Sequence, residues 1–191
     1  MAENKHNPTT SKSPVMTMNF NSFGGGAGPN APVCMNMEPY PSVDAAPADP
    51  KTVAIIKQNR SGAAGELTAI AQYIFQNNRT DEENFANGIL QIALVEMMHL
   101  DMLGDAIQAL GGKPTFDDGK YYWQAGAVNY ADKLPGMLRA NIEDEQTAIK
   151  NYEQSVADTP NEQVKALFRR IITDEQLHIV YFTDLLAKVA P

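Results

Sequence analysis

From residue 50 onward, apolar side chains recur at every third or fourth position, the spacing of helices that bury one face. Four such stretches follow one another. The Gly111–Gly112 pair ends the second stretch, and Pro160 lies in the turn before the fourth. The pattern predicts four long helices at about 51–77, 80–110, 133–158 and 162–188.

The second and third helices are joined by a long segment, Lys113–Asp132. Each helix should be about 40 Å long, and about 12 extended residues would cover that distance. The segment can therefore recross the bundle, and we expect Trp123, with Tyr121 and Tyr122, to pin it there. The predicted fold class is all-α, a four-helix bundle of two antiparallel hairpins joined by a long crossover.

The first 50 residues differ in composition, since they contain eight of the twelve prolines and a run of glycines. Neither residue type sustains a helix or a central strand. We therefore predict an extended N-terminal arm, 1–50, without a fold of its own, and a bundle domain, 51–191. The arm should add little to the bundle core and either contact another subunit or stay mobile. Cys34 would lie in it, where its thiol could crosslink two subunits under oxidation.

Charge and cysteine content exclude several functions. Acidic residues outnumber basic ones by 23 to 15, for a net charge of -8, which argues against nucleic acid or an anionic membrane as partner. One cysteine excludes an internal disulfide, a thiolate zinc site and a Cys-ligated iron–sulfur cluster, and suits a reducing cytoplasm. No apolar run is long enough to cross a bilayer.

The chain contains an internal repeat with an offset of 79 residues. The segments 66–73 (ELTAIAQY) and 145–152 (EQTAIKNY) are identical at five of eight positions. Thirty residues after the Glu of each segment comes a Glu-x-x-His motif, 96–99 in the first half and 175–178 in the second. Each half of the chain thus carries the same pattern, a Glu on one helix and Glu-x-x-His on the next.

This spacing predicts a metal centre. A Glu and a His three residues apart project from one helix face, and the Glu thirty residues earlier should lie at the same height on the antiparallel partner helix. Packing the two hairpins together then gathers six side chains: Glu66, Glu96, His99, Glu145, Glu175 and His178. Burying four bare carboxylates is prohibitive unless they are protonated or bind cations, and two divalent ions would neutralise them.

The ligand types narrow the choice of metal. Oxygen-rich sites with one imidazole each suit iron or manganese, and the sequence does not decide between these two metals. Each imidazole should donate its second ring N–H to a carboxylate or a carbonyl that fixes its tautomer.

With these motifs, residues from about 51 to 191 resemble the ferritin-like superfamily, above all the rubrerythrin and bacterioferritin-like proteins and, more distantly, the manganese catalases. The resemblance implies that the six gathered residues are dimetal ligands and that Glu96 and Glu175 bridge the metals. It also implies that Tyr73 and Tyr152 lie beside the metals. There, as catalytic residues, they could hydrogen-bond a ligand carboxylate or quench a one-electron oxidant; packed core tyrosines are the alternative.

Two functions remain open. One is a dimetal oxidoreductase that consumes hydrogen peroxide or dioxygen, in oxidative-stress defence or metal handling. With iron and an as yet unknown electron donor this would be peroxidase or ferroxidase chemistry, and with manganese it would be peroxide disproportionation. The other is a metal-binding storage or structural protein whose N-terminal arm mediates subunit contacts. A homo-oligomer is expected in either case.

Overall fold

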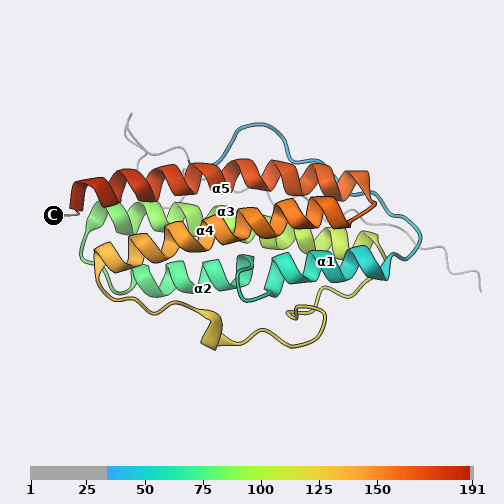
Figure 1. The fold of residues 1–191 in the computed structure, drawn as a ribbon, viewed down its shortest axis with the longest axis horizontal. Coiled ribbons are helices and arrows are strands. Elements are labelled where there is room, and N and C mark those ends of the chain that lie inside the picture. The colour runs from blue at the N-terminus through green and yellow to red at the C-terminus, as the bar shows by residue number, and fades with distance from the viewer. Residues whose placement is uncertain (1–33, 190–191) are drawn as a thin grey trace, which may run out of the picture.

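The computed structural model describes residues 34–189. The helices in this part of the chain are α1 (Pro50–Ser61), α2 (Glu66–Asn77), α3 (Glu83–Ala109), the short 3-10 helix η2 (Ala125–Ala127), α4 (Leu134–Asp158) and α5 (Glu162–Val189). Helices α1 and α2 lie end to end along one edge and together take the place of one helix of a four-helix bundle (Figure 1). The all-α four-helix bundle is confirmed. Among the described helices, none has both the length and the apolar character that a membrane span requires.

The connection between α3 and α4 runs back along the whole bundle, so that α4 begins at the same end as α3 (Figure 1). The predicted crossover is therefore confirmed. Trp123 anchors it, because its indole Nε1 donates a hydrogen bond of 2.9 Å to Thr68 Oγ1. Tyr121 and Tyr122 do not share this role, since they are 72% and 75% exposed.

The first predicted helix, 51–77, is in fact two helices. The backbone leaves the helical conformation at Gly62 (φ -72°, ψ 179°). A Cβ atom at Gly62 would lie 2.4 Å from Gln58 O, and one at Gly65 would lie 2.3 Å from Asn59 O, so both positions require glycine. The prediction failed here because the apolar spacing continues through the break. The break makes Glu66 the first residue of α2.

Two buried apolar clusters occupy the two halves of the bundle. One contains Leu103, Ala106 and Ile107 of α3 and Leu110 just after it, packed with buried side chains of α1 and α5. The other contains Phe85, Ile89, Ile92 and Ala93 of the same helix. The α3 residues between these two stretches include Glu96 and His99, which are also buried. The clusters therefore enclose a polar layer at the middle of the bundle.

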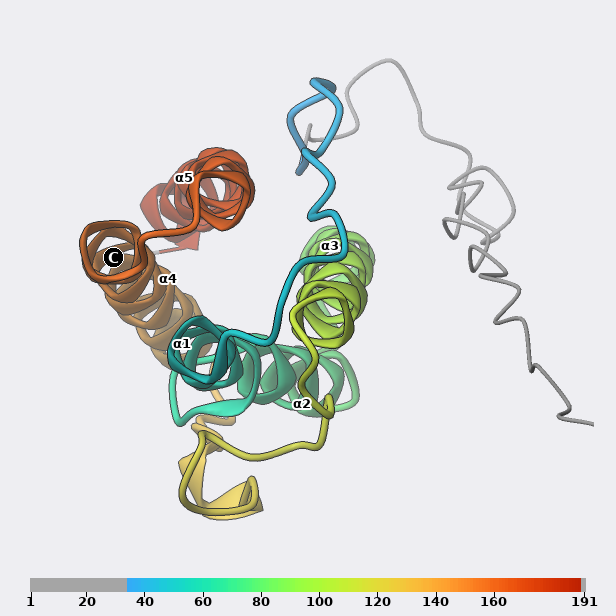
Figure 2. The ribbon, with the colours of Figure 1, turned by 90° about the vertical axis from the view of Figure 1, so that its right-hand side faces the viewer.

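Residues 34–44 lie along the bundle between α3 and α5, and the chain then passes the C-terminal end of α3 to reach α1 (Figure 2). Cys34 is 6% exposed and belongs to the second apolar cluster, and Tyr40 and Val43 pack against the first. The expectation that the arm adds little to the core is therefore wrong for residues 34–49. Its apolar side chains find a surface on the bundle, and Cys34 is buried rather than placed in a mobile tail. The expectation for residues 1–33 lies outside the described residues, and the division at residue 50 stays a prediction.

Candidate metal centre

The six residues gathered by the repeat meet in the polar layer. Helix α2 contributes Glu66, α3 contributes Glu96 and His99, α4 contributes Glu145, and α5 contributes Glu175 and His178. All six are at most 4% exposed. They form two groups, and within each group one potential ligand atom per residue lies within 4.8 Å of all the others. The structure thus brings the six side chains together, while their role as metal ligands stays a prediction.

The two groups share two residues. Glu66 and His99 belong only to the first group, Glu145 and His178 belong only to the second, and Glu96 and Glu175 belong to both. Each group thus has one imidazole and three carboxylates. Glu96 and Glu175 could therefore contact an ion in either group, as carboxylates that bridge two ions must.

Two carboxylate oxygens in this cluster lack a hydrogen bond. Among the described residues, Glu96 Oε1 and Glu175 Oε1 are buried without one. Glu96 Oε1 lies 3.0 Å from His178 Nδ1, but without hydrogen-bond geometry. Buried unsatisfied oxygens are costly, and a cation would satisfy them. The donor set and its two unsatisfied oxygens therefore fit a pair of divalent cations.

The electrostatics show how the cluster behaves without metal. Burial, reinforced by neighbouring carboxylates, raises the pKa of Glu96 well above its usual value. Burial and the charge of Glu175 raise the pKa of Glu145 to about 7. Burial also acts to raise the pKa of Glu175, but the hydrogen bond from His178 and the nearby charge of His99 outweigh it, and the pKa falls.

The two imidazoles show the reverse balance. Burial lowers the pKa of His99 and His178, but the surrounding carboxylates outweigh it and hold both pKa values well above normal. The metal-free cluster therefore retains protons that cations would displace on binding.

The two repeat tyrosines contact the carboxylates crosswise. Tyr73 on α2 donates its hydroxyl hydrogen to Glu145 Oε1 on α4, and Tyr152 on α4 donates to Glu66 Oε1 on α2. Both tyrosines are 1% exposed. They therefore pack in the core and also hydrogen-bond the cluster, whereas a role in quenching an oxidant stays a prediction.

Each histidine turns Nδ1 toward the carboxylates and Nε2 outward. His99 Nε2 lies 3.2 Å from Asp174 Oδ2 and 3.3 Å from the hydroxyl of Tyr40. His178 Nε2 lies 2.9 Å from the carbonyl oxygen of Cys34. A carboxylate and a carbonyl thus stand where such acceptors were expected. Sequence reasoning missed Tyr40 and the Cys34 carbonyl, and the apolar residues scattered through the arm were the available signal.

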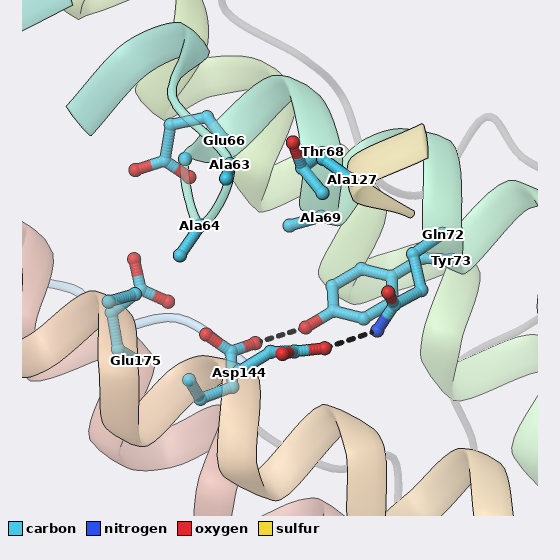
Figure 3. Close-up of a pocket in the computed structure, with 13 residues that line it drawn as sticks. Ala63, Ala64, Glu66, Thr68, Ala69, Gln72, Tyr73, Ala127, Asp144 and Glu175 are labelled. Carbon is cyan, nitrogen blue, oxygen red and sulfur yellow. Dashed lines mark hydrogen bonds between the residues drawn. The ribbon is translucent and has the colours of Figure 1, made fainter. Parts of the chain in front are cut away.

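A small cavity reaches the cluster at the break between α1 and α2 (Figure 3). Its volume is about 30 Å³, which exceeds the roughly 10–15 Å³ that a cavity needs to hold one water molecule. Glu66, Glu145 and Glu175 line it on the inside, and Ala63 and Ala64 line it at the break. The cavity can therefore admit a molecule of the size of water or peroxide.

The family model named Ferritin-like domain matches residues 62–190. The chain belongs to the ferritin-like family. It is 30% identical to a bacterioferritin of Desulfovibrio desulfuricans over 137 residues, which is 69% of this chain and 73% of that protein. It is 22% identical to a probable manganese catalase of Clostridium acetobutylicum over 163 residues, 74% of this chain and 72% of that protein.

A solved structure gives a further comparison for this ferritin-like chain. The structure of KatB, a manganese catalase from Anabaena, superimposes on this chain with a TM-score of 0.74. The two sequences are 27% identical, and the match covers 81% of this chain and 79% of KatB. The resemblance to the ferritin-like superfamily is thus confirmed. The relatives include one protein named as a bacterioferritin and others named as manganese catalases, so the comparisons leave the choice between iron and manganese open.

Proposed function

We propose that this ferritin-like protein is a dimetal oxidoreductase that consumes hydrogen peroxide or dioxygen, with hydrogen peroxide as the favoured substrate. The observation that carries the proposal is the double carboxylate–histidine cluster with its shared pair, Glu96 and Glu175. The likeness to the Anabaena manganese catalase, which extends over most of each chain, supports peroxide as the substrate.

Each group of the cluster would hold one ion, iron or manganese. Glu66 and His99 would bind the first ion, and Glu145 and His178 the second, with the shared carboxylates between them. When bound, the two ions would supply Lewis acidity and exchange two electrons with one O–O bond. Disproportionation then balances within the site: one peroxide loses two electrons and two protons to become dioxygen, and a second takes them up to become two waters.

The side chains of this protein prepare that chemistry. The hydroxyls of Tyr73 and Tyr152 each occupy one oxygen of a carboxylate, which orients Glu145 and Glu66 and leaves their second oxygens for an ion. The polar layer lies between two apolar clusters that keep bulk water out. The small cavity limits the substrate to a molecule of a few atoms.

Metal analysis combined with peroxide assays tests the proposal. Protein loaded with Mn²⁺ or Fe²⁺ should contain two ions per chain, and the manganese form should release one dioxygen for every two peroxides without any electron donor. Turnover only with an added donor would place the protein with peroxidases instead. Failure to bind two ions of either metal would contradict the proposal as a whole.

A second candidate function is metal storage or structural assembly, with the cluster as the binding site. The similarity to the Desulfovibrio desulfuricans bacterioferritin favours it. Two bound ions without turnover of peroxide or dioxygen would support this function. A homo-oligomer is part of both proposals, and analytical ultracentrifugation of the full chain would measure its size.

The cavity at the helix break offers a separate test. Ala64→Leu would fill the narrow space beside Glu66, and peroxide turnover should fall roughly tenfold, equal to a barrier rise of about 1.4 kcal/mol. The metal content should stay at two ions, because no ligand changes. The control is Ala157→Leu, at an exposed position of α4 away from the cavity. Equal turnover in both variants would show that peroxide enters elsewhere.

A further inference from the structure

The segment 34–40, here called the strap, passes over the outer edges of both histidines. Its first residue offers the Cys34 carbonyl to His178 Nε2 at 2.9 Å, and its last places the Tyr40 hydroxyl 3.3 Å from His99 Nε2. The rings of Tyr40 and His99 meet edge to face, with centroids 5.9 Å apart. One short extended segment thus contacts the outer nitrogens of the imidazoles from both halves of the cluster.

A buried arginine of α5 holds the strap in place. Arg170 Nε donates a 2.8 Å hydrogen bond to the carbonyl of Glu38, and Arg170 Nη2 donates to the carbonyl of Asn36. The guanidinium carbon also lies 4.0 Å from the centroid of the Tyr40 ring. Arg170 is only 8% exposed, so these contacts are shielded from water and are stronger than surface pairs.

One carboxylate joins the strap to the cluster. Asp174 is fully buried, and its Oδ1 accepts a 2.6 Å hydrogen bond from the backbone N–H of Asn36. Its Oδ2 accepts from the Tyr40 hydroxyl at 2.5 Å and from Arg170 Nη1 at 2.7 Å, and it also lies 3.2 Å from His99 Nε2. One buried carboxylate thus contacts the strap, Arg170 and His99 at the same time.

We propose that the strap positions His99 and His178 for the two ions, so that docking of the strap and binding of metal stabilise each other. This inference rests on the proposed metal centre. With both Nε2 atoms oriented by Asp174 and the Cys34 carbonyl, both Nδ1 atoms are held toward the carboxylates. A coupling of this kind is reciprocal: whatever loosens the strap weakens metal binding, and metal binding tightens the strap.

Tyr40→Phe tests the first half of the coupling in the full-length chain. The change removes the hydroxyl and keeps the ring that packs on Arg170, so the fold is retained. Mn²⁺ affinity, measured by competition with a chelator, should fall roughly tenfold, within the range that loss of an outer-shell partner costs. The matched control is Tyr121→Phe, because Tyr121 is 72% exposed and should leave the affinity unchanged.

Alkylation of Cys34 tests the second half. The chain has a single cysteine, so all thiol modification reports on the strap. In the parent protein, modification should be at least several-fold slower with Mn²⁺ than without it, and this protection should shrink in Tyr40→Phe. Equal Mn²⁺ affinity in the two Tyr variants, or equal alkylation rates with and without Mn²⁺, would overturn the proposal. A parent protein that binds neither Mn²⁺ nor Fe²⁺ would instead refute the proposed function.

Discussion

Replacing Glu96 by Gln is expected to remove both metal ions rather than one. Glu96 belongs to both ligand groups, and one of its oxygens is buried without a hydrogen bond. The amide keeps the shape of the side chain but loses the negative charge that two cations need. Peroxide turnover should fall with the metal, by more than the roughly 10–100-fold that loss of an outer-shell partner costs.

Two further variants make this test specific. Glu66 belongs to one group only, so Glu66→Gln should remove one ion and leave the other. Glu143 lies exposed on α4, two residues before Glu145, and Glu143→Gln should retain both ions. Metal analysis of the purified variants should find no ion in Glu96→Gln, one ion in Glu66→Gln and two ions in Glu143→Gln. A Glu96→Gln protein that keeps two ions would contradict the assignment of Glu96 as a shared ligand.

Much of this architecture could be predicted because its signals are local. Helices α4 and α5 begin and end within about a residue of their predicted bounds, since Pro135, Pro160 and Asn161 mark their ends in the sequence. The gathering of the cluster also follows from local geometry. A Glu and a His three residues apart share a helix face, and a short turn fixes the height of the partner helix.

The two features that the sequence analysis missed depend on contacts between distant residues. The break at Gly62 and Gly65 is invisible in the apolar spacing, because what demands glycine is the close approach of backbone carbonyls. The position of the strap depends on Arg170 and Asp174, which are more than 130 residues away in the chain. A proline-rich composition shows that such a segment is not helical, but it does not show which surface the segment covers.

Metal binding should raise the midpoint temperature of unfolding, Tm, and the rise should grow with pH. In the metal-free protein, Glu96 and Glu145 have pKa values above their ordinary value, so the folded state binds protons more tightly than the unfolded state. Their contribution to stability is fully present below pH 4.5 and is lost as the pH rises through about 7 in the case of Glu145. His99 and His178, whose pKa values are also raised, act in the same direction above their ordinary value of 6.5.

Glu175 acts in the opposite direction in a different pH range. Its lowered pKa contributes stability that is lost only as the pH falls below 4.5. The metal-free protein should therefore lose stability between about pH 5 and pH 8. In the metal-loaded protein the ions have already displaced the protons, and they bind more tightly as competition from protons declines. The two Tm curves should consequently diverge as the pH rises.

The size of the effect follows from mass action. Free metal at 100 times the dissociation constant stabilises the folded state by about 2.7 kcal/mol for each site, or about 5 kcal/mol for two sites. In a chain of this size each kcal/mol shifts Tm by roughly 2–4 °C, so loading should raise Tm by roughly 10–20 °C near neutral pH. Calorimetry of chelator-treated and Mn²⁺-loaded protein at about pH 6 and pH 8 measures the shift, and Glu96→Gln is the control that should show none. A shift that is the same at both pH values would mean that metal and protons do not compete for these side chains, which would argue against the carboxylate–histidine cluster as the metal site.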